Sequence, residues 1–218
     1  MAEELGKIEK PEAEQFREKR KLYLVPLLFS WEDAPDDYKE KLNHYWQQVA
    51  EHIANLESKI GRVNRVYHES ITISGEEGLK LLEKLHPSVC QIASDKCQSG
   101  AEFEVTEDKE LVEESIDWER HLLMGFVSQN VARKVSEFYT EASRKRYEFI
   151  TNRINESLQD NEVAVLFIRE GHMVQFPQDL EVFSIAPPVL DEIHRWLRDY
   201  STKQPEEPEE KKETEEET

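Results

Sequence analysis

The chain has 218 residues, of which 38% are hydrophobic and 34% are charged, and its formal net charge is −19. That length suffices for one sizeable core, and the composition is that of a polar globular protein rather than a wholly disordered one. The acidic excess argues against binding to nucleic acid or to an anionic membrane, because proteins with those partners usually carry a basic excess.

Other bulk features point to a soluble protein. No apolar run approaches the roughly 20 residues of a membrane span, and no apolar segment near the N-terminus predicts a secretory signal. Cys90 and Cys97 are the two cysteines, which is too few for a disulfide scaffold or a four-ligand zinc site. We therefore expect a cytoplasmic location with reduced thiols.

The two ends of the chain differ from its middle. Residues 1–16 are polar, and residues 204–218 hold eight Glu, two Lys and no apolar side chain. A segment that cannot bury apolar surface stays disordered, so we expect a loose N-terminal segment and a disordered acidic tail. The tail carries −6 of the net charge, which leaves −13 on residues 1–203.

The first half of the chain alternates strand and helix signals. Apolar residues on both faces of 21–30 predict a covered strand, which Pro26 places at a sheet edge or interrupts. Apolar residues at alternating three- and four-residue steps predict a long amphipathic helix over 36–60, with Asp36 or Asp37 as its N-cap. Residues 62–74 read as a strand, 78–85 as a short helix, 88–94 as another strand, and 94–108 as a loop.

The middle of the chain predicts two helices. Thr106 is expected to cap the first, which carries Leu111, Ser115, Leu122 and Phe126, and the second runs over about 129–158. Gly125 and Ser128 mark the break between them. This helix pair, 106–158, is compatible with a projecting hairpin inside a larger domain.

The C-terminal part predicts a β-hairpin followed by a strand and a helix. Residues 162–170 and 172–176 form the two arms, with Gly171 supplying positive φ at the turn, and 180–186 is the next strand. Pro187 and Pro188 begin a helix that continues to about residue 200. The fold class that follows is α/β, with a mixed sheet of about four to six strands and long amphipathic helices in one domain over 17–203.

Four residues are candidates for catalysis. Glu170 and His172 flank the turn in "REGH" and could act as an acid–base pair, although turn tips are polar for solvation alone. In "VYHES", strand alternation places Glu69 beside Tyr67, Ile71 and Ile73, with His68 on the opposite face. A carboxylate buried there would be functional, unless it pairs with an Arg or Lys from a packing helix or lies at an edge in contact with solvent.

Two further groups of side chains raise other kinds of site. Glu114, Asp117 and His121 share one helix face and could bind a divalent metal, but no second helix offers matching ligands, and a solvated acidic face is the preferred explanation. Basic clusters at 17–21 (Arg17, Arg20) and 144–153 (Arg144, Lys145, Arg146, Arg153) could bind phosphate or RNA, unless they serve as partners for the surplus carboxylates. No motif implies a cofactor or a structural metal.

Three functions remain open. The first is an interaction or regulatory protein that binds a protein partner, or itself as a homodimer, through its long amphipathic helices. The second is an RNA- or ribosome-associated factor that uses the basic clusters, and the net charge disfavours it. The third is an enzyme with a carboxylate and histidine pocket near Glu69. A pocket lined by Glu69, His68, Glu170 or His172 would favour the enzyme.

Overall fold

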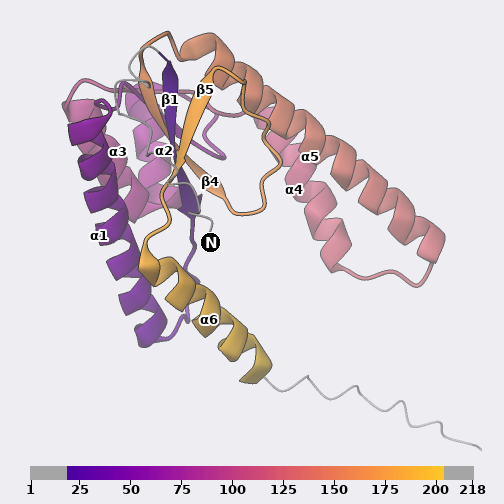
Figure 1. Ribbon diagram of the computed structural model, residues 1–218. Coiled ribbons are helices and arrows are strands. Elements are labelled where there is room, and N and C mark those ends of the chain that lie inside the picture. Colours follow the sequence, from indigo (N-terminus) through magenta and orange to yellow (C-terminus); the bar gives the residue numbers. More distant parts are fainter. Residues whose placement is uncertain (1–18, 204–218) are drawn as a thin grey trace, which may run out of the picture.

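The centre of the molecule is a parallel β-sheet. The computed structural model describes residues 19–203, which contain five strands and six helices (Figure 1). The strand order across the sheet is β3-β2-β4-β1-β5, and every pair of neighbours is parallel. The strands are β1 (Arg20–Leu27), β2 (Arg65–His68), β3 (Glu102–Phe103), β4 (Val163–Arg169) and β5 (Leu180–Ser184).

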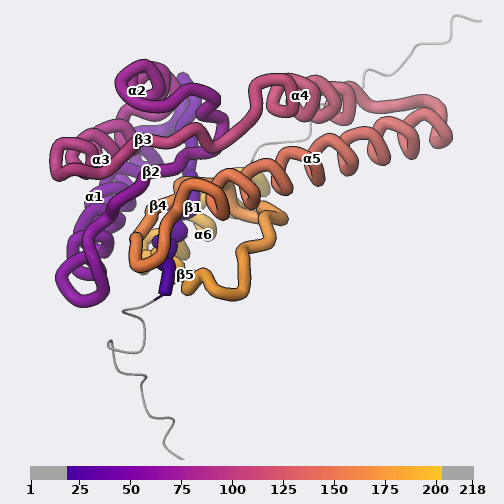
Figure 2. Tube along the Cα trace, turned by 90° about the horizontal axis from the view of Figure 1, so that it is seen from above, coloured from indigo at the N-terminus to yellow at the C-terminus, as the bar shows by residue number. Residues whose placement is uncertain are grey.

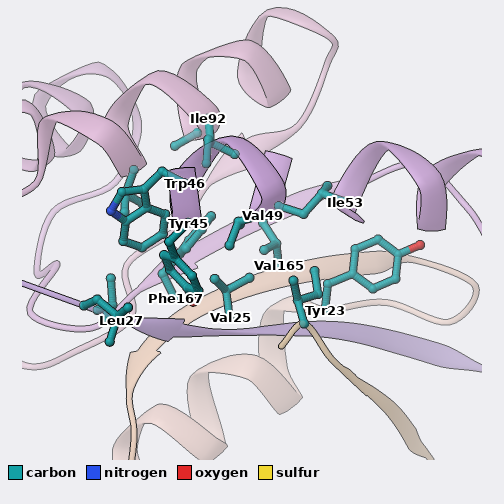
Figure 3. Packing of buried hydrophobic residues seen from close by; sticks show 14 of the residues in the cluster. Tyr23, Val25, Leu27, Tyr45, Trp46, Val49, Ile53, Ile92, Val165 and Phe167 are labelled. Atoms are coloured by element: carbon teal, nitrogen blue, oxygen red, sulfur yellow. The ribbon is translucent and has the colours of Figure 1, made fainter. Parts of the chain in front are cut away.

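One face of the sheet carries the larger core. It is covered by α1 (Asp36–Lys59), α2 (Gly75–Leu85), α3 (Pro87–Gln98) and α6 (Pro188–Lys203). Figure 3 shows the apolar stripe of α1 lying over Val25, Val165 and Phe167 of the two central strands. The phenolic hydroxyls buried here are satisfied, since Tyr45 donates to the Pro26 carbonyl at 2.6 Å and Tyr23 to the Gly61 carbonyl at 2.9 Å.

The opposite face is covered by the C-terminal half of α5 (Gln129–Ser157). Ile150 and Ile154 pack on Leu22 and Leu166, which alternate along their strands with the residues of the first core. Strands buried on both faces need apolar residues at every position, as the expected strand at 21–30 has. Within 19–203, Cys90 and Cys97 are both free thiols.

The helices α4 (Lys109–Leu123) and α5 form an antiparallel hairpin that extends well beyond the sheet (Figures 1 and 2). Asp108 caps α4, because its carboxylate accepts from the amides of Glu110 and Leu111 at 2.9 and 3.1 Å. Small or short buried side chains let the two helices approach closely: Val112, Ser115, Val135 and Ala142. The rings of Trp118 and Phe138 stack across the pair at 4.9 Å.

The α/β class is confirmed, but the mixed sheet and the C-terminal hairpin are wrong. Residues 172–176 form no strand, and β4 and β5 lie on opposite sides of β1, both parallel to it. The hairpin was expected because Val174 and Phe176 alternate with polar residues, as the residues of a strand do. Their side chains instead pack on the core under α5, so that residues 170–179 cross the sheet face without pairing.

Several local expectations also need correction. Residues 88–94 lie inside α3, and the region expected as a loop over 94–108 contains the short strand β3. Pro35 is the N-cap of α1, and Asp108 rather than Thr106 caps α4. Pro26 does not lie at a sheet edge, because β1 is an interior strand. Pairing between β1 and β5 ends at Leu24, two residues before Pro26. The amide hydrogen that proline lacks is therefore not missing from any hydrogen bond between β1 and β5.

Candidate functional site

The carboxyl ends of β1, β2 and β4 meet at one edge of the sheet. The chain leaves β2 toward the face under α1 and leaves β4 toward the face under α5. Such a reversal of direction is where open parallel sheets bind ligands. Three of the four catalytic candidates, His68, Glu69 and Glu170, end or follow these strands and therefore lie at this edge.

Glu69 is buried and ion-paired. Its side chain is 2% exposed, and Nε of Arg169 lies 3.2 Å from both carboxylate oxygens. Burial raises the pKa of Glu69, and Arg169 opposes that shift. The ion-pair alternative therefore describes this carboxylate, but the partner comes from the end of strand β4 and not, as expected, from a packing helix. The expected alternation is wrong, because Ser70 adopts a φ of 69° and sends Ile71 to the core opposite that of Tyr67.

A second buried ion pair joins the sheet edge to the hairpin. Arg146 of α5 binds both carboxylate oxygens of Glu107, through Nε and through Nη2 at 2.6 Å, and both side chains are almost fully buried. The Ser70 amide also donates to Glu107 at 2.6 Å. Glu107 was not a candidate from the sequence, and Arg146 was proposed to bind phosphate. The one local signal that could have identified Glu107 is its position next to Asp108, the N-cap of α4.

His68 and His86 are two buried, neutral imidazoles. The Nδ1–H of His68 donates to the Glu69 carbonyl, and the Nε2–H of His86 donates to the Leu28 carbonyl at 2.9 Å. Burial lowers the pKa of His86 and lowers that of His68 to about 3. Their ring centroids are 6.1 Å apart, and neither remaining ring nitrogen has a partner within 19–203. Within residues 19–203 these histidines belong to no group of three or more side chains that could hold a metal ion, so the pair lacks the ligand set of a zinc site.

Glu170 and His172 do not form an acid–base pair with each other. The carboxylate of Glu170 lies 2.7 Å from Nε2 of His194 in α6. The His172 ring is half-buried beside Phe176, and burial lowers its pKa. Gly171 between them has a φ of +75°, so the positive φ expected at this glycine is confirmed although the turn leads to no second strand.

A cavity lies beside these residues without including them. It encloses about 830 Å³ between one face of α5 and the segment 171–175, and its lining includes Tyr139, Tyr147, Gly171, Met173 and Gln175. None of His68, Glu69, Glu170 and His172 lines it. This cavity is therefore not the carboxylate and histidine pocket that would favour an enzyme.

The acidic and histidine face of α4 is exposed and locally bonded. Glu114 accepts from the Trp118 indole, Asp117 faces Arg120 at 3.4 Å, and His121 donates to the Asp117 carbonyl at 2.7 Å. No cluster of three or more residues suited to metal binding occurs in the described part of the chain.

Each described cation that was proposed to bind phosphate or RNA pairs with a carboxylate. Arg144 pairs with Glu141 and Glu148, Lys145 with Glu141, and Arg153 with Glu104 and Glu156. Arg20 pairs with Asp179 at 2.6 Å. Arg17 lies outside the described residues.

The turn between α4 and α5 exposes a group of apolar side chains. Leu123, Met124 and Val127 are 83%, 77% and 107% exposed, and Val131 is also exposed. Gly125, with a φ of +70°, ends the helical path between them. We call residues 120–136, which include this turn, the hairpin tip. Sequence reasoning missed it because it searched for charged and polar residues.

The fold and these features define an α/β protein with a buried charged edge and a projecting helical arm. Comparisons with protein-family models, with curated proteins and with solved structures found no match.

Proposed function

We propose that the chain is an interaction protein that docks through the tip of its α4–α5 hairpin. The observation that carries this proposal is the exposure of Leu123, Met124 and Val127 at the end of an arm that projects from the sheet. Single exposed apolar residues are ordinary on protein surfaces, whereas adjacent ones mark a contact surface. These three lie within five positions of one turn.

The root of the arm is built to hold the tip in place. The bidentate pair between Arg146 and Glu107 ties α5 to the residue before the α4 cap. A fully desolvated ion pair of this geometry fixes the direction of both side chains. Ile150 and Ile154 then anchor the same helix on the sheet, so that the tip is presented by a supported arm rather than by a loose loop.

The alternative functions find less support. The cations of 144–153 face carboxylates, which is the arrangement expected if they offset the acidic surface rather than bind RNA. An enzyme at the sheet edge would need an accessible reactive group, but Glu69 is paired and His68 is enclosed. A homodimer through the α1 stripe is also less favoured, because Tyr45, Val49 and Ile53 are buried against the sheet.

Site-specific photo-crosslinking in cells that express the full chain tests the proposal. A photoreactive residue at Val127 should give a discrete crosslinked species, and adding Leu123→Ser to the same chain should abolish it. The matched control places the photoreactive residue at Leu85, which is exposed on α2. Equal crosslinking from Val127 and Leu85, or crosslinking at Val127 that ignores Leu123→Ser, would contradict docking through the tip.

The same experiment separates self-association from other contacts. A species with twice the mass of the chain would identify a second copy as the partner, and sedimentation of the Leu123→Ser, Val127→Ser variant should then show a loss of dimer.

A further inference from the structure

The hairpin tip differs in charge from the rest of the chain. Residues 120–136 contain three cations, Arg120, Arg133 and Lys134, and no carboxylate, within a chain of net charge −19. This basic and apolar segment is the chemistry that anionic lipid surfaces attract. We infer that the tip inserts into the surface of an anionic membrane, an inference that rests on the proposed function and names its partner.

The apolar residues form a cap on the arm rather than a stripe along it. Leu123 is the last residue of α4, and Gly125 turns the chain away with its positive φ before Val127. A helix that fills a protein groove presents anchors along one continuous face, and this turn interrupts that face. A cap of this kind instead enters a bilayer end-on, with its side chains in the boundary between headgroups and acyl chains.

The cations lie about one helical turn behind this cap. Arg120 precedes the end of α4 by three residues, and Arg133 and Lys134 lie in the second turn of α5. Arg120 and Arg133 share exposed ion pairs with Asp117 and Glu137, whose carboxylates lie farther from the cap than the two cations do. Exposed pairs of this kind contribute little. With the cap inserted, all three cations would reach the depth of the headgroups.

The acidic net charge of the chain would repel an anionic membrane, but the length of the arm keeps most of that charge away from the tip. From Gln129 to Arg146, where α5 meets the sheet edge, the helix rises about 25 Å at roughly 1.5 Å per residue. The Debye length at physiological ionic strength is about 8 Å, so the negative charge of the body is screened at the tip. The average charge argued against a membrane, but the membrane would meet only residues 120–136.

The mode of binding must be peripheral. None of the helices within residues 19–203 combines the length and the apolarity that crossing a bilayer needs. A short apolar cap with cations behind it gives reversible attachment that depends on lipid charge and on salt.

Vesicle flotation with the full chain tests this inference. The protein should float with vesicles of phosphatidylcholine containing phosphatidylserine, and at least about fivefold less with phosphatidylcholine alone, given the contribution of each surface cation. Leu123→Ser with Val127→Ser should reduce flotation about tenfold or more, because both apolar side chains leave the membrane. Arg133→Gln with Lys134→Gln should weaken binding to the anionic vesicles and leave the weak binding to neutral ones unchanged.

Leu85→Ser is the matched control, since it removes an exposed leucine of α2 and should leave flotation unchanged. Circular dichroism confirms that each variant is folded. Absence of flotation, equal flotation with both lipid compositions, or equal loss in Leu85→Ser would overturn the inference.

These outcomes separate the lipid inference from the proposed function. Crosslinking of Val127 to a protein without any vesicle flotation would remove the membrane and keep a docking tip. Binding to RNA that survives Leu123→Ser with Val127→Ser, together with no flotation on anionic vesicles, would show an electrostatic surface and would overturn the lipid inference. If neither crosslinks nor flotation depend on the tip, the proposed function fails as well.

Discussion

Arg146 of α5 and Glu107, 39 positions earlier in the chain, form a buried bidentate ion pair at the root of the hairpin. This pair connects the arm to the carboxyl edge of the sheet, because the amide of Ser70, just beyond β2, donates to the same carboxylate. The Glu69–Arg169 pair lies at the same edge. Two ion pairs thus occupy the place where parallel sheets commonly bind ligands.

Removing one partner of the Glu107–Arg146 pair should be strongly destabilising. Glu107→Ala would leave the guanidinium of Arg146 buried and unpaired, at a cost of about 3–5 kcal/mol in the free energy of unfolding. Glu107→Leu combined with Arg146→Met should recover most of that loss, because the charge that would lack a partner is also removed. Urea denaturation of the single and double variants measures both effects.

The control for this pair is exposed and lies on the same helix. Arg144→Ala breaks the pairs with Glu141 and Glu148 and should leave the urea midpoint unchanged, since such surface pairs contribute little. A double variant as unstable as Glu107→Ala would show that packing volume, and not the unpaired charge, causes the loss.

Gly171 allows the cost of a positive φ to be measured separately from steric clashes. Its φ is +75°, and a Cβ added there would meet no atom within 4 Å. Gly171→Val should therefore destabilise the protein by about 1–3 kcal/mol through backbone strain alone, as measured by urea denaturation. Gly171→Asn is the control, because asparagine tolerates the left-handed region and should be much less costly. Equal effects of the two would point to a different cause.

The long helices could be predicted from the sequence, and the strand pairing could not. The expected helix over 36–60 is α1 at Asp36–Lys59, and the one over 129–158 is α5 at Gln129–Ser157. The spacing of apolar residues along a helix is a local property, so it can be recognised without knowledge of the fold. The parallel pairing of β5 with β1 joins residues about 160 positions apart, and the alternation of Val174 and Phe176 favoured a nearer partner.

The prediction of candidate sites was limited in the same way, because it could use local patterns but not contacts between residues far apart in the chain. The burial of Glu69 and its pairing with a cation could be anticipated, but the partner Arg169 lies 100 positions away. The hairpin tip was missed because the net charge of −19 is a property of the whole chain and does not describe residues 120–136. A scan for segments without carboxylates would have identified it.

The outer part of the hairpin should open independently of the sheet. Between Gln129 and Phe138, Val135 is the one α5 residue that is fully buried, whereas every residue from Val163 to Ile168 of β4 is buried. Amides with few buried contacts exchange through local opening. Hydrogen exchange should give opening free energies for residues 133–140 that are at least about 2 kcal/mol below those of β4. Equal values across both elements would mean that arm and sheet unfold as one unit.

Acid should destabilise the protein through His68. Burial lowers the pKa of His68 to about 3, whereas the same side chain in the unfolded chain titrates near 6.5. The unfolded state therefore binds the additional proton between these values, so the stability that His68 contributes is fully present above about pH 6.5 and is lost as the pH falls toward 3. Linkage gives a loss of about 2 kcal/mol between pH 7 and pH 5 from this residue alone.

Other groups at the sheet edge modify that slope in known directions. The lowered pKa values of His86 and His172 act in the same sense as that of His68. The raised pKa of Glu69 acts in the opposite sense, because its contribution is present at low pH and is lost as the pH rises through the folded value. His68→Phe should therefore flatten the pH dependence between 7 and 5 without abolishing it. Urea denaturation at pH 7, 6 and 5 measures both proteins, and a His68→Phe slope equal to that of the unmodified chain would show that His68 binds its proton equally in the folded and unfolded states.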